Sequence, residues 1–263
     1  KMIKEFSKHK PKAIVVECMA VMPQYQWISE KKMIQSTIGV ITNVRPDHLD
    51  EMGYDQESIA LSLSNSIPNN AKLILGESKF QGEFEKIANR YKTDIKIANS
   101  NSISNEYLEQ FPYLEHRSNI ATALLVCKEL GVKADLALKS IMATNPDPGS
   151  LKYYKLGDKK SESIFINGFA ANDPESSLSV WDLISLKFEN YKSAVFLNTR
   201  LDREYRTKQL IHLVVNIIKP KLFIIKGDNV NSILKEYSES LEYIKIVKFP
   251  DSSNQDIIVN EIK

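Results

Sequence analysis

The 263-residue sequence has little cysteine, little net charge and no long apolar run. Its two cysteines, Cys18 and Cys127, lie far apart in apolar stretches, which predicts buried free thiols in a reducing compartment and argues against a metal pair. Basic residues number 35 against 33 acidic ones, a balance that predicts no nucleic-acid partner. No apolar run approaches the roughly 18 residues that a transmembrane helix needs, and no secretory signal precedes the first expected strand.

What the sequence does contain is an alternation of short apolar strands with segments of helical spacing. In the first half, strands are expected at 13–16, 38–42, 72–75 and 94–98, with helices between them, such as one over 56–67. This alternation is typical of an α/β fold with a largely parallel sheet.

Two prolines and one glycine within 145–149 predict a domain boundary. The boundary divides the chain into residues 1–149 and 150–263. The second part repeats the alternation of strands and helices, so we expect a second α/β domain. Its strands are expected at 163–166, 194–197, 221–225 and 243–249.

Polar residues gather where the strand at 38–42 is expected to end. Pro46 lacks the amide donor that a strand interior needs, so a loop should follow. That loop holds Asp47, His48 and Asp50, and ligands of open α/β sheets bind at the carboxyl ends of strands. The plainer alternative is that Asp47 caps the next segment and Asp50 is solvated.

Glu17 and the start of the helix at Asn119 also allow either a ligand-binding role or a purely structural one. Glu17 follows the expected buried strand at 13–16, where an isolated carboxylate would be costly. It therefore either serves a metal or phosphate site or bonds to nearby backbone amides. Ser118 and Asn119 precede an apolar helix expected over 120–130, and either residue suits the N-cap of that helix.

A dense charged group follows the strand expected at 194–197 in the second half. Arg200, Arg203 and Arg206 surround Asp202 in the sequence, and guanidinium groups suit the recognition of phosphate or carboxylate. A solvated helix start with i,i+3 pairs is the alternative.

Five blocks of sequence, taken in order, resemble a known family. The sequence is similar to the CapB/PgsB subunits of poly-γ-glutamate synthase, within the Mur ligase superfamily that includes the peptidoglycan amino-acid-adding ligases and folylpolyglutamate synthetase. The resemblance covers nearly the whole chain. The blocks are ECMAV (17–21), NVRPDHLDEMG (43–53), NPDPG (145–149), FINGFAAND (165–173) and LNTRLDREYRT (197–207).

This resemblance implies an ATP-dependent amide ligase that works through an acyl phosphate and lengthens a γ-glutamyl chain. It implies a Mur-ligase-like central domain that binds ATP and Mg²⁺, followed by a Rossmann-like C-terminal domain. By position, Glu17 and His48 would hold the magnesium, although Mg²⁺ prefers oxygen ligands and a histidine is less typical.

The resemblance also implies roles for other residues. Asn119 would face the adenine, and Asn43 and Asp47 would belong to the same nucleotide site. Arg200, Asp202 and Arg203 would lie on an inter-domain cleft and neutralise phosphate or substrate carboxylate. Asn167 and Asn172 fall where Mur ligases carry an acidic and polar loop, and the asparagine at 167 weakens a direct transfer of that role.

Three departures from the superfamily pattern bear on the activity. No G-x-x-x-x-G-K-[ST] motif occurs in these residues, so we expect the phosphate-binding loop upstream of Lys1, along with any membrane segment. Residues 58–70 contain no lysine for a carbamylated metal ligand. The last strand of the C-terminal domain is expected beyond Lys263. A fragment of this kind would be inactive alone.

The expected partners are glutamate, the growing γ-glutamyl chain and membrane subunits of a capsule synthase. The expected location is the cytoplasm, at the membrane through an upstream segment or those subunits, and self-association is left open. One alternative is a non-catalytic scaffold subunit without a P-loop. Another is a metal-dependent hydrolase that uses Glu17, Asp47, His48 and Asp50, which is weakened by the presence of only four histidines.

Overall fold

The computed structural model describes residues 2–111, 113, 115–144, 151–157, 162–228, 230–237, 241 and 243–262. The chain forms two compact units, Lys1–Asn145 and Pro146–Lys263. The predicted boundary at 145–149 lies outside the described residues. Each unit is considered by itself below.

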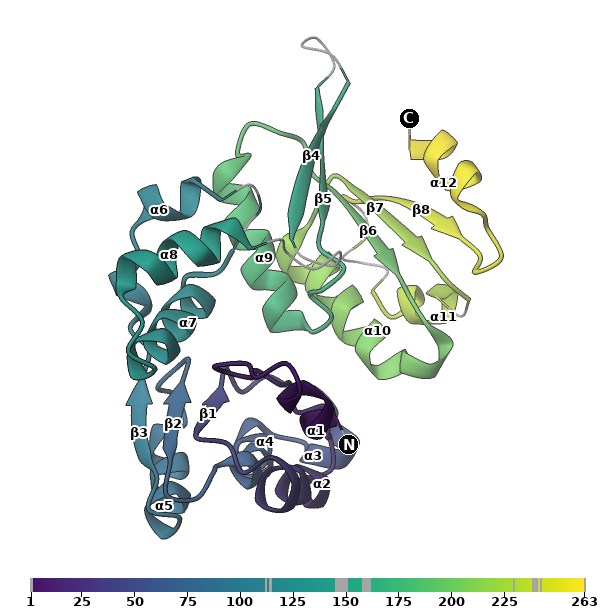
Figure 1. Cartoon of the computed structure of the whole chain (residues 1–263). Helices are drawn as coiled ribbons and strands as arrows, with labels where there is room; N and C mark the ends of the chain where they lie inside the picture. The colour runs from purple at the N-terminus through teal and green to yellow at the C-terminus, as the bar shows by residue number, and fades with distance from the viewer. Residues whose placement is uncertain are drawn as a thin grey trace. The chain divides into compact units, whose positions relative to one another are not determined.

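The first unit has a three-stranded parallel sheet of order β1-β2-β3 (Figure 1). Its elements are α1 Met2–Ser7, α2 Pro23–Ile28, the π-helical η1 Ser29–Ile34, β1 Ile38–Ile41, α3 Leu49–Met52, α4 Gln56–Leu63, η2 Ser64–Ser66, β2 Lys72–Leu75, α5 Gln81–Arg90, β3 Asp94–Ile97, η3 Ser100–Ser102, α6 Asn105–Glu109, α7 Arg117–Glu129 and α8 Ala134–Ala143.

The central strand β2 carries the core of this unit. Side chains alternate between the two faces of a strand, and Leu73 and Leu75 accordingly join a buried cluster with Ile59 of α4 and Phe84 of α5. Ile74 is equally buried, and α7 packs against β2. The strand is thus enclosed by helices, as the alternation of strands and helices predicts.

A charged clamp ties α7 to the sheet of the first unit. The Glu129 carboxylate lies 2.7 Å from the Lys72 amine on β2 and 2.8 Å from the Lys96 amine on β3. These two contacts lower the pKa of Glu129 to about 2, with the hydrogen bond from Lys72 contributing most. The Glu129 side chain is only 7% exposed, so the clamp closes over one end of the helix.

The second unit has a parallel sheet of order β6-β7-β8 and a separate antiparallel pair, β4 with β5 (Figure 1). Its elements are β4 Lys152–Leu156, β5 Ser163–Asn167, α9 Pro174–Lys187, β6 Ala194–Asn198, η4 Leu201–Arg203, α10 Glu204–His212, the π-helical η5 Leu213–Ile218, β7 Leu222–Lys226, α11 Val230–Lys235, β8 Lys245–Phe249 and α12 Gln255–Ile262.

The central strand β7 anchors the core of this unit. Phe223 and Ile225 are fully buried in a cluster with Val215 of η5 and Ile233 of α11. Burial of a phenylalanine of this kind contributes about 2–3 kcal/mol to folding. The parallel α/β architecture predicted from the sequence is therefore confirmed in both units.

The residues at the start of α9 explain why the helix begins there. Asp173 is its N-cap and accepts a hydrogen bond from the Ser176 amide at 2.9 Å, with Pro174 in the first turn. The strand β4 was not expected from the sequence. It pairs with β5, and its Tyr153 ring meets Phe188 edge-on, with ring centroids 5.5 Å apart.

Candidate functional site

The loop after β1 is fixed at its first turn by two side chains from other elements. Val44 is buried, and its amide donates to Glu77 Oε1 at 2.8 Å. The Gln56 side-chain amide, at the start of α4, donates to the Val44 carbonyl at 3.4 Å. Glu77 also lies 3.8 Å from the Arg45 guanidinium. A carboxylate just beyond β2 thus holds the loop that follows β1.

Gly76 lets the ends of β1 and β2 approach closely. Its amide donates to the Ile41 carbonyl at 2.9 Å, and a Cβ atom at this position would collide with the Thr42 carbonyl oxygen. The same Cβ would lie 3.0 Å from the Thr122 hydroxyl of α7. The two strand ends and α7 therefore form one wall, as the parallel sheet predicts.

Asp47 and His48 project from this wall as a linked pair. His48 has a φ of +50°, in the left-handed region that few non-glycine residues adopt. Its amide donates to Asp47 Oδ1 at 2.9 Å, and its Nε2 atom lies 3.7 Å from Asp47 Oδ2. The side chains are 41% and 34% exposed, so both can reach a ligand.

The plainer interpretation of this loop holds only in part. The N-cap position of α3 belongs to His48, while the Asp47 carboxylate accepts from the His48 amide rather than from α3. Asp50 lies exposed in the first turn of α3, and Asn43 is exposed before Val44.

The prediction of a buried strand before Glu17 is wrong. Residues 13–17 form no strand, Val15 is 94% exposed, and Glu17 and Cys18 are exposed as well. The reason is physical: a β-branched run becomes a strand only where another strand pairs its backbone, and β1 pairs only with β2 among the described residues. Among the described residues, Glu17 forms no hydrogen bond or ion pair with His48, and its role stays a prediction.

The prediction that Ser118 or Asn119 caps α7 is also wrong. The helix begins at Arg117 with His116 as its N-cap, and Asn119 lies exposed in the first turn. Its side-chain amide donates to Glu115 Oε1 at 2.8 Å, and the same oxygen accepts from the His116 amide. Glu115 thus organises the helix start in place of a serine or asparagine cap.

In the second unit, the loop after β6 is fixed to the end of β7. Thr199 is buried, and its amide and hydroxyl both donate to the Lys226 carbonyl, at 2.8 and 3.0 Å. Gly227 follows with a φ of +143°, and a Cβ atom there would collide with the Thr199 hydroxyl. This close approach orients the charged group that follows.

Arg200 and Asp202 form a bidentate ion pair at that strand end. The Arg200 Nε and Nη2 atoms donate to the two Asp202 oxygens at 3.0 and 2.7 Å. This hydrogen bonding lowers the pKa of Asp202. Both side chains are more than half exposed, and Arg203 is half-buried at the end of η4.

Asn167 and Asn172 flank the turn between β5 and α9. Asn167 ends β5, and its Oδ1 atom accepts from the Phe169 amide at 3.2 Å. Asn172 is exposed directly before the buried N-cap Asp173. Within the second unit, all five predicted residues therefore follow the carboxyl ends of strands β5 and β6.

Across the described ranges, no group of three or more histidine, cysteine, aspartate or glutamate side chains is arranged to hold a metal ion. Nor does any helix in those ranges have the length and apolar character to cross a bilayer. The sequence interpretation missed Glu77, Glu115 and Thr199. Glu77 lies two residues beyond the buried strand β2, much as Glu17 follows the strand expected at 13–16, so the sequence contained this signal.

Comparison with known proteins shows which proteins this chain is similar to. Residues 153–263 match the model of the poly-γ-glutamate synthase CapB C-terminal domain. The chain is 34% identical over 240 residues to the capsule biosynthesis protein CapB of Bacillus anthracis, covering 91% of this chain and 52% of that protein. It is 36% identical over 228 residues to the PGA synthase CapB of Bacillus subtilis, covering 86% of this chain and 58% of that protein. The chain is a CapB homologue.

Solved structures with low sequence identity share the fold of this CapB homologue. Folylpolyglutamate synthase from Thermotoga maritima superposes with a TM-score of 0.63 at 12% identity, over 98% of this chain and 62% of that one. A bifunctional folylpolyglutamate synthase/dihydrofolate synthase from Yersinia pestis, complexed with AMPPNP and a Mn ion, gives 0.56 at 13%, over 84% and 60%. A murein peptide ligase from Psychrobacter arcticus gives 0.55 at 12%, over 88% and 52%. The CapB homologue spans little more than half the length of its curated relatives.

Proposed function

We propose that this chain is part of an ATP-dependent amide ligase that joins glutamate residues into a γ-glutamyl chain. The observation that carries the proposal is 34–36% identity to two CapB proteins across about nine-tenths of the chain. The loop that presents Asp47 and His48 beside a second strand end supports it, because ligands of parallel sheets bind at such edges.

The reaction would proceed in two steps. A carboxylate oxygen of the growing chain attacks the γ-phosphorus of ATP, which gives an acyl phosphate and ADP. The amine of the incoming glutamate then attacks the acyl carbon, the amide bond forms, and phosphate leaves with loss of a proton from nitrogen. Both steps gather negative charge on phosphate oxygens, so cationic and hydrogen-bonding groups at the strand ends would accelerate them.

A magnesium site in the first unit would need ligands from outside it, because its described residues bring no metal-binding group of acidic and histidine side chains together. Mg²⁺ usually takes one or two carboxylates together with phosphate oxygens and water, and it would neutralise phosphate charge. We assign Glu17 and His48 to this ion. Asp47 holds His48 through the amide contact and the 3.7 Å approach, so it would position the imidazole. Asn43 and Asn119 would contact the nucleotide.

The residues of the second unit would bind anionic groups. Arg200 is already held in a forked geometry by Asp202, which prepares its guanidinium for a phosphate or a carboxylate. Arg203 would add a second guanidinium to the same ligand. Asn167 and Asn172 would donate hydrogen bonds from the neighbouring strand end.

The test is phosphate release by the intact protein with ATP, Mg²⁺ and a γ-glutamyl acceptor, measured with and without glutamate. A ligase releases phosphate only when glutamate is present, and the product gains one γ-linked residue by mass spectrometry. A non-catalytic scaffold would release none under any of these conditions. The 263-residue chain alone is expected to bind ATP weakly, because it carries no P-loop motif. Micromolar affinity by calorimetry would contradict that expectation.

We also propose that the protein works in the cytoplasm beside membrane subunits of a capsule synthase. The CapB relatives are named for capsule and PGA synthesis, which supports this placement. Co-purification of the intact protein with membrane subunits would test it, and recovery of the protein without any of them would count against it.

A further inference from the structure

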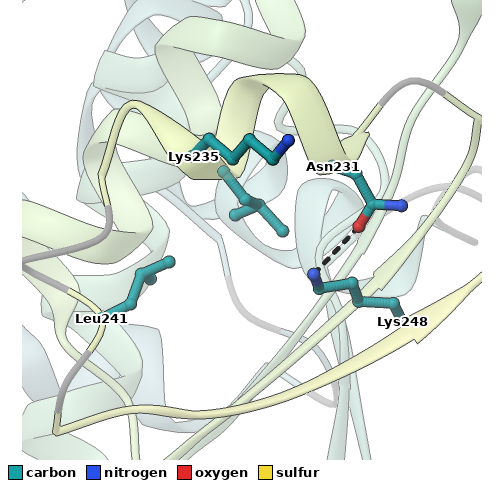
Figure 2. A pocket seen from close by; sticks show the side chains of 5 residues that line it. Asn231, Lys235, Leu241 and Lys248 are labelled. Atoms are coloured by element: carbon teal, nitrogen blue, oxygen red, sulfur yellow. Dashed lines mark hydrogen bonds between the residues drawn. The ribbon is translucent and has the colours of Figure 1, made fainter.

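A pocket of about 570 Å³ lies between α11 and β8 in the second unit (Figure 2). Its lining consists of two lysines, one asparagine and two leucines: Asn231, Leu234, Lys235, Leu241 and Lys248. The lining therefore contains no acidic side chain.

The fold explains why these groups meet. Asn231 and Lys235 are four residues apart on α11, so they share one face of the helix. Lys248 is the penultimate residue of β8, and its amine donates to Asn231 Oδ1 at 2.9 Å (Figure 2). This bond leaves the Asn231 amide NH₂ as a donor for another group. The Leu234 side chain is buried beneath them.

Among the described residues, Lys235 and Lys248 form no ion pair with a carboxylate, unlike Lys155 and Lys208 of the same unit. Lys208 lies 3.1 Å from Glu204, and Lys155 lies 3.3 Å from Glu162. The pKa of Lys208 is raised by its hydrogen bond to Glu204 and, less strongly, by the charge of Glu236, so Glu236 faces α10. Within the part of the chain that the structure describes, two ammonium groups without a carboxylate partner thus share one pocket with an amide donor.

We propose that this pocket binds carboxylate groups of the γ-glutamyl chain through residues other than those assigned to ligation. The inference rests on the proposed function for the identity of the polymer. Each γ-glutamyl unit carries one free carboxylate and two methylene groups. Lys235 and Lys248 would each pair with a carboxylate, and the leucines of the lining would contact the methylenes. Such a site would retain the product between additions and favour repeated extension.

The experiment measures binding of a γ-glutamyl oligomer to the 263-residue chain by calorimetry, without ATP. Lys235→Gln and Lys248→Gln are each expected to weaken binding by about fivefold, the upper range for an exposed ion pair. Lys245→Gln is the matched control, because Lys245 is exposed on the same strand and does not line the pocket. It should change affinity by less than twofold.

Equal loss of affinity in all three variants would overturn the inference, since it would indicate only general attraction to positive charge. Absence of oligomer binding by the unaltered chain would overturn it too. Glutamate monomer and inorganic phosphate at equal ionic strength should bind more weakly than the oligomer, and equal binding would again contradict a polymer site. Oligomer binding is measured without ATP, so its result does not depend on ligation. If the intact protein shows no ligase activity while the oligomer still binds to this pocket, only the proposed ligase function is refuted.

Discussion

In both units a glycine directly follows the central strand of a three-stranded parallel sheet, Gly76 after β2 and Gly227 after β7. Each glycine lies against the end of the neighbouring edge strand. Gly76 approaches the Thr42 backbone carbonyl, whereas Gly227 approaches the Thr199 side-chain hydroxyl. A backbone atom therefore excludes a side chain at the glycine of the first unit, and a side-chain atom excludes one at the glycine of the second.

The loops that these strand ends hold differ in the same way. In the first unit, a charged side chain from the next strand end, Glu77, accepts from the buried Val44 amide. In the second, the hydroxyl and amide of Thr199 bond within the pair of strands themselves. The comparison indicates that the Asp47–His48 loop depends on a side chain at the neighbouring strand end, while the Arg200 loop depends on a backbone carbonyl there.

The largest expected effect is on Gly76. Gly76→Ala should destabilise the first unit by about 3 kcal/mol, because the added methyl group meets a backbone oxygen that cannot rotate away. Gly227→Ala should also destabilise, but the double change Gly227→Ala with Thr199→Ala should recover part of the loss by removing the colliding hydroxyl.

Denaturant unfolding checks this difference between the two glycines. Gly82→Ala is the control, because no atom lies within 4 Å of a Cβ there and the residue is in α5. It should stabilise by about 0.5–1 kcal/mol. If Thr199→Ala does not recover any of the stability lost in Gly227→Ala, the proposed difference between the two glycines is wrong.

Glu77 should matter more to its loop than Thr199 does. Glu77→Ala leaves the buried Val44 amide without its acceptor, at a cost of about 2 kcal/mol. Thr199→Ala removes one hydroxyl bond and keeps the amide bond, at a cost of about 1 kcal/mol. Chemical denaturation measures both, with the exposed Glu57→Ala as control. A larger loss of unfolding free energy in Thr199→Ala than in Glu77→Ala would contradict the greater importance of Glu77 for its loop.

The Lys72–Glu129–Lys96 clamp should make the first unit sensitive to acid. The pKa of Glu129 is about 2 in the folded protein against an ordinary 4.5, so its carboxylate stabilises the fold above pH 4.5. That contribution is lost as the pH falls from 4.5 towards 2. The difference in melting temperature between the unaltered protein and Glu129→Gln should thus shrink across this range. A difference that stays constant with pH would rule the clamp out as the cause.

The smallest effect on stability is expected at Asp202. The Arg200–Asp202 pair is bidentate but exposed, and exposed pairs contribute little to folding. Asp202→Asn should leave the melting temperature unchanged. Under the proposed function it should lower the rate of ligation, because the Arg200 guanidinium loses the carboxylate that orients it. A clear drop in melting temperature would assign the pair a structural role.

Much of the fold could be predicted from local pattern. The strand β2 occurs over Lys72–Leu75 as expected, because its continuous apolar run is buried on both faces. The start of α9 at Pro174 follows from its Asp173 cap and first-turn proline. These elements are specified by residues close in sequence, so the sequence is sufficient to predict them.

The wrong or missing predictions concern residues that depend on distant partners. The run at 13–16 has strand composition, but no described strand pairs with it. Glu115 organises the start of α7 from outside the helix, which cap preferences alone do not reveal. The hydrogen bond from the Val44 amide to Glu77 joins residues that are 33 positions apart in the sequence. The candidate site could thus be located by its strand ends, but the contacts that hold it could not.

The most direct test of the central claim is turnover by the intact protein after changes at the two proposed metal ligands. His48→Ala and Glu17→Ala should each abolish Mg²⁺-dependent phosphate release in the presence of glutamate. His9→Ala and Glu57→Ala should leave it unchanged, because both residues are exposed and neither belongs to the proposed site. Unaltered turnover by His48→Ala and Glu17→Ala would contradict the account.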